Sequence, residues 1–458
     1  MRRGAMEALL TGVFRTAAAL LIGCALGLAA PARPAAAANG PPLIRDAEIE
    51  ATLRRVADPI FRAANVTPST VDLYLLQDPE MNAFVADGQN IFINTGMITR
   101  LDTIDELRGV IAHETGHIVG GHLARRAQAT SGGRNMVLLG LLGAAAVGIA
   151  GAPDASVAIA AGSQQVARRN LLAYSRGEEA AADQMGVRYV ATAGGDPGAI
   201  LDVLRIFRGQ EAMMPGIDPY AQSHPMSVER MAMLEDRIAK LPKGGPPSAE
   251  DAYWYGRMVT KLDAFLDRPA KTLREHPVSD QSEMAALARS IAYYRLPDMA
   301  RAGAQMDALI AMRPEDPYYI ELKGQFLLES GKAEAAAASY GRAAELAPDE
   351  PLILAGLGRA LLNTDDPDAT ARARDVLARA TRLDRRNPDA LRDLALAEAR
   401  LGHEGAAALA TAERFTMTGD ARDVLRNATR AADLLPVGSP GWRRAQDMIT
   451  MARRALKQ

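Results

Sequence analysis

The amino-acid sequence predicts a mainly α-helical protein with one small β-sheet, in which a first domain is followed by an all-α solenoid of helical repeats. Alanine-rich stretches dominate and aromatic residues make up only 5% of the chain, which favours helices. Short strand-like segments occur between residues 71 and 95 and suffice for a small sheet. From residue 249 onward, a proline-containing pattern recurs with the spacing of helical repeats. The length of 458 residues suits two or three domains.

The first 38 residues have the features of an export signal. Three arginines precede or adjoin an apolar stretch at residues 17–30, which is too short to span a bilayer comfortably, and residues 35–38 are alanines that suit cleavage. We therefore expect residues 1–38 to be a cleaved signal peptide and the protein to be periplasmic, with an association with the outer membrane left open. The single cysteine, Cys24, lies inside this segment, so the exported domains can form no internal disulfide. Lipidation of Cys24 is the alternative to such cleavage.

The charge balance argues against a nucleic-acid partner. The chain has 53 basic and 55 acidic side chains, and removing the four basic and one acidic residues of the signal segment leaves 49 and 54, a net charge of −5. A nucleic-acid-binding domain would instead carry an excess of lysine and arginine.

A helix predicted at residues 44–64 precedes a small sheet. Its predicted strands are residues 71–76, 82–86 and 90–95. Asp87-Gly88-Gln89 predicts a hairpin between the last two strands. Because the sheet is small, we expect one strand to be an open edge to which a substrate peptide could add as a further strand. The candidate edge strand comprises Asn90, Ile91, Phe92, Ile93 and Asn94. An ordinary hairpin within the core is the alternative.

The sequence carries an H-E-x-x-H motif, His113-Glu114-Thr115-Gly116-His117, on a helix that a capping box at residues 103–106 is expected to begin. Histidines four residues apart lie one turn apart on the same helix face, so both imidazoles can bind one metal ion. Glu114 then projects beside them, where it can take a proton from a water molecule in an open coordination position. This arrangement is typical of a zinc hydrolase. Because the motif is short, a third ligand is needed to support the prediction.

A glutamate from a later helix is the predicted third ligand. His122 is a rival, but on a continuing helix it would lie roughly 140° away from His117, so we expect it to pack or hydrogen-bond nearby. Glu179 and Asp183 lie four residues apart, with three alanines between them that permit close helix packing. Glu179 would bind the metal, and Asp183 would accept the free N–H of a ligand histidine. Glu178 competes with Glu179 for the ligand role. The alternative is that Glu179 and Asp183 are only solvated charges on a surface helix.

An apolar hairpin is predicted at residues 136–161. Its longest apolar run, residues 136–150, would reach roughly 22 Å as a helix, short of a hydrocarbon core of about 30 Å. We therefore expect no spanning helix here, and the segment packs either against the protein itself or against a membrane or client protein.

The first domain is expected to cover residues 44–242, and a Gly/Pro-rich linker follows it. Beyond the linker, Met312–Pro317 recurs 34 residues later at Leu346–Pro351 and again, 37 residues on, at Leu383–Pro388. Small and apolar residues between these copies fall where a tetratricopeptide repeat needs them. Residues 249–456 are therefore predicted to form a tetratricopeptide solenoid, an architecture whose concave surface binds extended or helical partners.

The motifs together resemble a known metallopeptidase family, the one that contains CAAX prenyl proteases and HtpX. The resemblance rests on H-E-x-G-H at residues 113–117 and on Y-S-R-x-x-E-x-x-A-D at residues 174–183. A further segment, Ser223-His224-Pro225 with Glu229-Arg230, is similar to the family's S-H-P…E-R pattern. The appended repeats make the BepA-type periplasmic members the most similar group.

The resemblance implies a gluzincin-type zinc endopeptidase domain with one Zn²⁺ per chain. The implied ligands are His113, His117 and Glu179, and His224 would approach the zinc from a loop, either capping the site or stabilising the oxyanion. A structural histidine is the alternative for His224.

The expected function is therefore an exported zinc metalloendopeptidase that binds and cleaves misfolded or stalled envelope proteins. Partners would be protein and peptide substrates, with contacts to outer-membrane assembly machinery through the repeats. The alternative is a periplasmic chaperone or assembly factor for outer-membrane proteins, in which the repeats carry the function and proteolysis is minor or latent.

Overall fold

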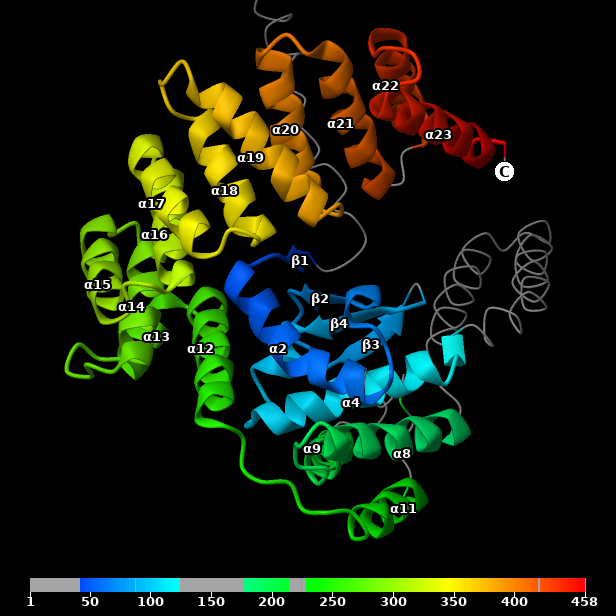
Figure 1. Cartoon of the computed structure of the whole chain (residues 1–458). Coiled ribbons are helices and arrows are strands. Elements are labelled where there is room, and N and C mark those ends of the chain that lie inside the picture. Colours follow the sequence, from blue (N-terminus) through cyan, green and yellow to red (C-terminus); the bar gives the residue numbers. More distant parts are fainter. Residues whose placement is uncertain are drawn as a thin grey trace, which may run out of the picture. The chain divides into compact units, whose positions relative to one another are not determined.

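Figure 1 shows the computed structural model of the chain. It describes residues 42–86, 88–123, 176–213, 224, 228–418 and 421–457. The predicted signal peptide with Cys24, the apolar hairpin at 136–161, and the residues on either side of His224 lie outside this described part. The compact unit that is described below begins at Leu43.

A four-stranded sheet lies at the centre of the first part of the chain (Figure 1). Its strands are β1 (Leu43–Ile44), β2 (Asp72–Leu76), β3 (Ala83–Ala86) and β4 (Asn90–Asn94). The strand order is β1-β2-β4-β3, with β2 and β4 parallel and the other two pairs antiparallel. The hairpin predicted around residues 87–89 is confirmed, because β3 and β4 pair from Ala86 opposite Asn90 to Ala83 opposite Ile93.

The prediction that Asn90–Asn94 form an open edge is wrong. These residues form β4, which pairs with β2 on one side and with β3 on the other. The Phe92 ring stacks between Tyr74 of β2 and Phe84 of β3 at centroid distances of 5.0 and 5.2 Å, which stabilises β4 in this central position. The opposite face of β4 is buried in the core. Among the described strands, the sheet ends at β3.

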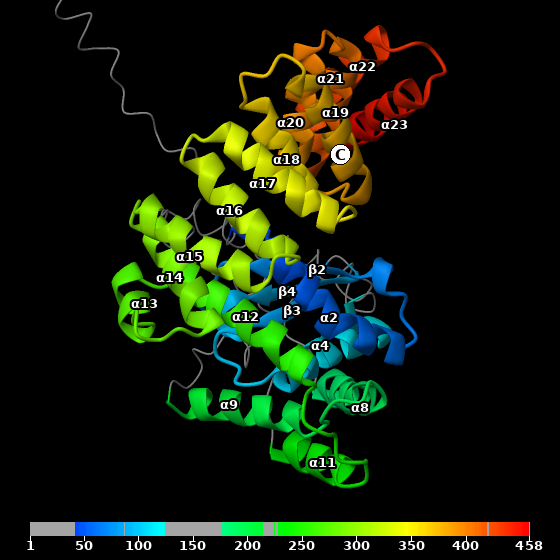
Figure 2. The same cartoon turned by 60° about the vertical axis from the view of Figure 1, so that its left-hand side comes forward.

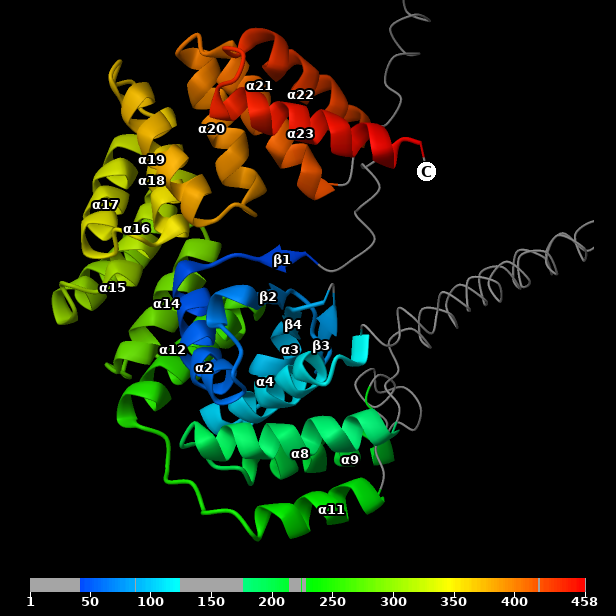
Figure 3. The same ribbon diagram turned by 45° about the vertical axis from the view of Figure 1, so that its right-hand side comes forward.

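Helices cover one face of this sheet and extend away from it in layers. They are α2 (Ala47–Ala63), α3 (Thr95–Ile98), α4 (Ile104–Val119), α8 (Arg176–Thr192), α9 (Ala199–Met213) and α11 (Val228–Ile238). Helix α4 packs against β3, α2, α8 and α9, so it lies between the sheet and the two later helices (Figure 3). This central position buries the H-E-x-x-H motif almost completely.

Helix α4 begins and packs as its sequence predicts. The hydroxyl of Thr103 accepts from the backbone N–H of Glu106, whose carboxylate accepts from the backbone N–H of Thr103, so the predicted capping box is confirmed. Near the other end, a Cβ on Gly116 would lie 2.8–2.9 Å from backbone atoms of Ala182. Only a residue without a side chain allows α4 and α8 to approach this closely, which brings the acidic face of α8 to the motif.

The rest of the chain is a stack of helices, as predicted for tetratricopeptide repeats (Figure 2). The helices are α12 (Ala249–Leu266), α13 (Pro269–Glu275), α14 (Glu283–Arg295), α15 (Met299–Met312), α16 (Pro317–Glu329), α17 (Ala333–Leu346), α18 (Pro351–Leu362), α19 (Ala369–Leu383), α20 (Pro388–Arg400), α21 (Glu404–Thr418), α22 (Ala421–Leu434) and α23 (Pro440–Ala455). The recurring prolines Pro317, Pro351 and Pro388 each occupy the first helical position of a repeat, where a missing N–H costs nothing. None of the helices in the described ranges is long and apolar enough to cross a membrane.

Helix α12 joins the two parts of the chain. Its Tyr255, Met258 and Leu262 belong to the core that contains the sheet and α4, whereas Ala264 belongs to the first repeat core. Two fully buried cations on α12, Arg257 and Lys261, form ion pairs with α2. The repeats therefore begin on a helix that is itself part of the first core.

Candidate metal centre

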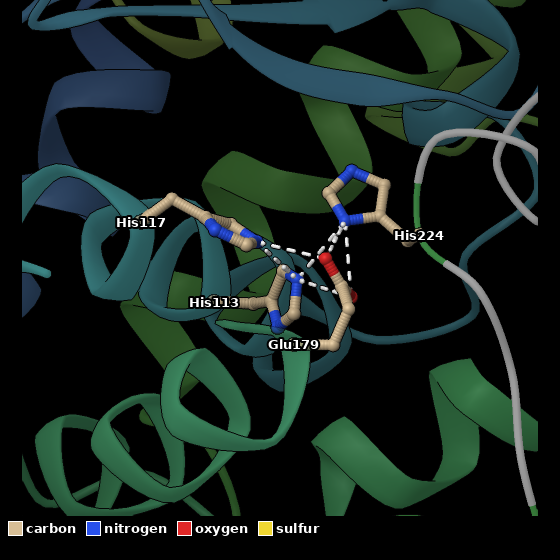
Figure 4. Close-up of side chains that lie close together, drawn as sticks. All are labelled: His113, His117, Glu179 and His224. Atoms are coloured by element: carbon tan, nitrogen blue, oxygen red, sulfur yellow. Dashed lines mark hydrogen bonds and ion pairs between the residues drawn. The ribbon is translucent and has the colours of Figure 1, made fainter. Parts of the chain in front are cut away.

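Four buried side chains converge at the centre of the first part of the chain (Figure 4). His113 and His117 project from α4, Glu179 projects from α8, and His224 lies opposite them. One potential ligand atom of each residue lies within 4.8 Å of those of the other three. Tertiary packing thus brings together segments that are more than a hundred residues apart in the sequence.

The spacing of these atoms fits a single metal ion. His113 Nε2 and His117 Nε2 are 3.1 Å apart, and the Glu179 carboxylate oxygens lie 3.5 Å from the first and 3.3 Å from the second. Zinc ligands at about 2.0–2.2 Å from the ion stand roughly 3.3–3.6 Å apart in a tetrahedron. Imidazole nitrogens with a carboxylate oxygen are also a donor set that zinc accepts.

Asp183 lies beside the ligand cluster, one turn after Glu179 on α8. Its Oδ1 is 2.9 Å from His113 Nδ1, so the carboxylate accepts the Nδ1–H of that imidazole while Nε2 faces the cluster. The contact is the one expected for Asp183 from the sequence.

Arg230 is a residue that sequence reasoning assigned no role. It projects from α11 and donates to both Asp183 oxygens at 2.5 and 2.8 Å, and its third nitrogen lies 2.8 Å from Glu179 Oε2. A planar guanidinium can hold two carboxylates in this way, whereas a lysine cannot. The only sequence signal for it was its place in the E-R part of the resemblance.

These contacts determine the charge of the cluster. Burial raises the pKa of Glu179, but His224, His113 and His117 outweigh that effect and lower it well below its usual range. For Asp183, burial is likewise outweighed by Arg230 and His113, so its pKa is lowered. Burial lowers the pKa of His117 to about 2. The two carboxylates therefore stay ionised and His117 stays neutral. Burial lowers the pKa of His113, but Asp183 and Glu179 outweigh that effect and raise it to about 10, so a metal ion that binds to His113 would displace a proton.

Glu114 lies in the same buried space but makes no comparable contacts. It is fully buried, and neither carboxylate oxygen has a hydrogen-bond partner among the described residues. The His224 ring lies beside it, with Nε2 at 3.6 Å from Glu114 Oε1. Burial raises the pKa of Glu114, although His224 and His113 oppose this. Such a carboxylate is suited to hold a water molecule or a substrate group.

His224 is fully buried and completes the cluster. Its Nδ1 lies 3.1 Å from Glu179 Oε1 and 3.3 Å from His113 Nε2. The ring therefore stands where a fourth ligand, a water molecule or a substrate oxygen would be placed. Glu178, the competing ligand, is partly exposed, in contrast to its fully buried neighbour Glu179.

Comparisons with known proteins agree with this site. Residues 44–238 match the sequence profile of peptidase family M48. The chain is 24% identical over 424 residues to the beta-barrel assembly-enhancing protease of Yersinia pestis. This alignment covers 90% of this chain and 85% of that protein. The protein of the same name from Escherichia coli (strain K12) is 24% identical over 408 residues, covering 87% and 82%. The mitochondrial metalloendopeptidase OMA1 of Schizosaccharomyces pombe is 28% identical over 182 residues, covering 40% and 51%.

Proposed function

Because this chain carries a domain of peptidase family M48 and is a metalloprotease, we propose that it is an exported zinc endopeptidase that binds and cleaves misfolded or stalled envelope proteins. The observation that carries this proposal is the convergence of His113, His117 and Glu179 beside the buried carboxylate of Glu114. The export signal predicted for residues 1–38 supports a periplasmic location.

In the proposed site, His113, His117 and Glu179 hold one zinc ion per chain. Asp183 orients His113, and Arg230 holds Asp183 and Glu179 together. A bound zinc ion would polarise the carbonyl of a peptide bond and would lower the pKa of a water molecule.

Glu114 is the proposed catalytic base. Its carboxylate takes a proton from the attacking water molecule and then delivers that proton to the leaving amine. Both steps require a carboxylate without another permanent partner, which matches the two oxygens that lack hydrogen bonds among the described residues. The raised pKa of Glu114 also suits a group that must accept a proton and hold it between the two steps.

His224 is the proposed regulator of the site. With its ring in contact with Glu179 and His113, it caps the position that a substrate oxygen would need. If the His224 ring is not in contact with these two residues when substrate binds, the same imidazole would instead stabilise the oxyanion of that substrate.

Substrate is proposed to bind beside β3. This strand ends the described sheet and packs on α4, so a peptide that added to its outer edge would lie next to the ligand helix. Main-chain hydrogen bonds to such an edge hold extended peptides irrespective of their sequence. This mode fits a protease whose clients are unfolded chains.

The repeats are proposed to select clients or to contact outer-membrane assembly machinery. Two of the relatives are named for beta-barrel assembly, and helical solenoids generally bind partners on their concave face. The second candidate function follows from the same feature: a periplasmic chaperone or assembly factor with minor or latent proteolysis.

The Glu114→Gln variant tests the proposed function. We expect it to bind zinc like the wild type but to lose cleavage of casein, because glutamine cannot accept the proton. Glu235→Gln, on the exposed side of α11, is the matched control and should cleave normally. Full activity of Glu114→Gln would remove Glu114 from the mechanism. Restoration of envelope-protein assembly by the inactive variant in cells that lack the protein would favour the chaperone function.

A further inference from the structure

A turn after α4 places His122 against the back of the His117 ring. The helix ends at Val119, and Gly121 then adopts φ +62°, a left-handed conformation that side chains disfavour. After this turn the His122 side chain packs against the last turn of α4, and only 2% of the residue is exposed. A histidine that followed a continuing helix would instead point away from His117.

Gly120 provides the space for the imidazole of His122. A Cβ at position 120 would lie 2.4 Å from His122 Nε2 and 2.8 Å from both Cδ2 and Cε1. These distances are shorter than van der Waals contact, so no other residue fits at 120 unless the ring moves. The two glycines therefore have different roles. Gly121 adopts the left-handed turn after α4, and Gly120 leaves room for the His122 ring.

The returned ring meets His117 on the side away from the ligand cluster. His122 Nδ1 and His117 Nδ1 are 2.7 Å apart, and the rings are tilted at 72° with centroids 4.9 Å apart. A hydrogen bond between two imidazole nitrogens needs one donor and one acceptor. A metal ligand at His117 Nε2 must keep its lone pair there, so the proton of His117 must reside on Nδ1. His122 Nδ1 is then the acceptor, and His122 carries its own proton on Nε2.

We propose that His122 is a positioning residue that fixes the tautomer and ring orientation of His117. The inference rests on the proposed role of His117 as a zinc ligand. Asp183 does the same for His113, but through an ionised carboxylate rather than a neutral imidazole. The two ligand histidines are therefore supported by acceptors of different charge, which leaves His117 the less basic of the two ligands.

Two substitutions at position 122 separate hydrogen bonding from packing. His122→Phe fills the space of the ring but removes the acceptor, whereas the Oδ1 atom of His122→Asn can accept at the place of Nδ1. We expect the zinc dissociation constant, measured by competition with a chelator, to rise about 10–100-fold in His122→Phe. We expect it to stay near the wild-type value in His122→Asn. The visible absorption of the cobalt-substituted protein should shift in His122→Phe and not in His122→Asn.

The outcomes distinguish this inference from the proposed function. Wild-type zinc affinity in His122→Phe, or equal weakening in both variants, would overturn the inference and leave the proposed ligands in place. Failure of the wild-type protein to bind zinc would overturn the ligand assignment itself. If His122→Phe does not fold, ¹⁵N NMR of histidine-labelled wild-type protein decides the question. The Nδ1–H tautomer for His117 and the Nε2–H tautomer for His122 are expected, and a proton on His122 Nδ1 would refute the proposal.

Discussion

Replacing Glu48 by glutamine removes a carboxylate that contacts two buried cations between α2 and α12. Its Oε1 lies 2.5 Å from Arg257 Nε, and its Oε2 lies 3.2 Å from Lys261 Nζ. The side chains of all three residues are fully buried. Each cation has a second partner, because Arg257 also pairs with Asp316 and Lys261 with Asp46. Glu48→Gln therefore leaves both cations buried with one carboxylate fewer.

The expected loss of stability follows from this burial. Removing one partner of a buried ion pair costs about 3–5 kcal/mol of unfolding free energy. Because Asp316 and Asp46 remain as partners, we expect Glu48→Gln to cost about 3 kcal/mol, at the lower end of this range. With a urea slope of about 3 kcal/mol per molar, the unfolding midpoint falls by roughly 1 M. Glu50→Gln on the same helix is the matched control, since Glu50 and its partner Arg45 remain 30% and 26% exposed. A partly exposed pair of this kind contributes about 0–1 kcal/mol, which is less than the buried pairs of Glu48.

Tryptophan fluorescence can follow this junction directly. The chain has two tryptophans, and the ring of Trp254 lies 5.0 Å from the guanidinium carbon of Arg257. In a Trp442→Phe background, urea titration then reports the region around α12. Equal midpoints for Glu48→Gln and Glu50→Gln would refute the view that the buried pairs stabilise the junction.

Three further predictions concern the ligand cluster and the junction. Glu179→Ala should lower the zinc content of the purified protein while Glu178→Ala should not, and the reverse result would reassign the ligand. His224→Ala should raise the rate of casein cleavage if the ring caps the site and lower it if the ring stabilises the oxyanion, whereas an unchanged rate would leave His224 a structural residue. Burial raises the pKa of Glu321 from 4.5 to about 8 against the opposing effect of Lys261. The stability linked to its protonation is complete below pH 4.5 and is lost as the pH rises through about 8. The urea midpoint of unfolding, followed by Trp254 fluorescence, should therefore be lower at pH 9 than at pH 6 in the wild type. The same decrease in a Glu321→Gln variant would contradict this assignment.

Periodicity made part of the site predictable from the sequence. Residues four apart on a helix share a face, so the pairs His113 with His117 and Glu179 with Asp183 could be identified from their spacing alone. The structure brings both pairs together and places Asp183 on His113. The capping box of α4 and the prolines of the repeats were also predictable, because each depends only on nearby residues.

Features that depend on tertiary contacts could not be obtained in this way. The strand order places β4 inside the sheet and β1 and β3 at its two edges, and no local pattern of Asn90–Asn94 contains that information. Arg230 comes from a separate helix, so its contacts with Asp183 and Glu179 had no spacing to reveal them. The predicted position of His122 assumed a continuing helix, and that geometry is wrong because Gly121 adopts a left-handed conformation. The expectation that His122 hydrogen-bonds near the site is confirmed.

The central claim is that His113, His117 and Glu179 together hold one zinc ion. Anomalous diffraction at the zinc edge, from crystals of the exported chain grown with one equivalent of zinc, tests it most directly. We predict a single strong peak about 2.0–2.2 Å from His113 Nε2, His117 Nε2 and a carboxylate oxygen of Glu179. A peak elsewhere, or no peak among these three side chains, would contradict the assignment.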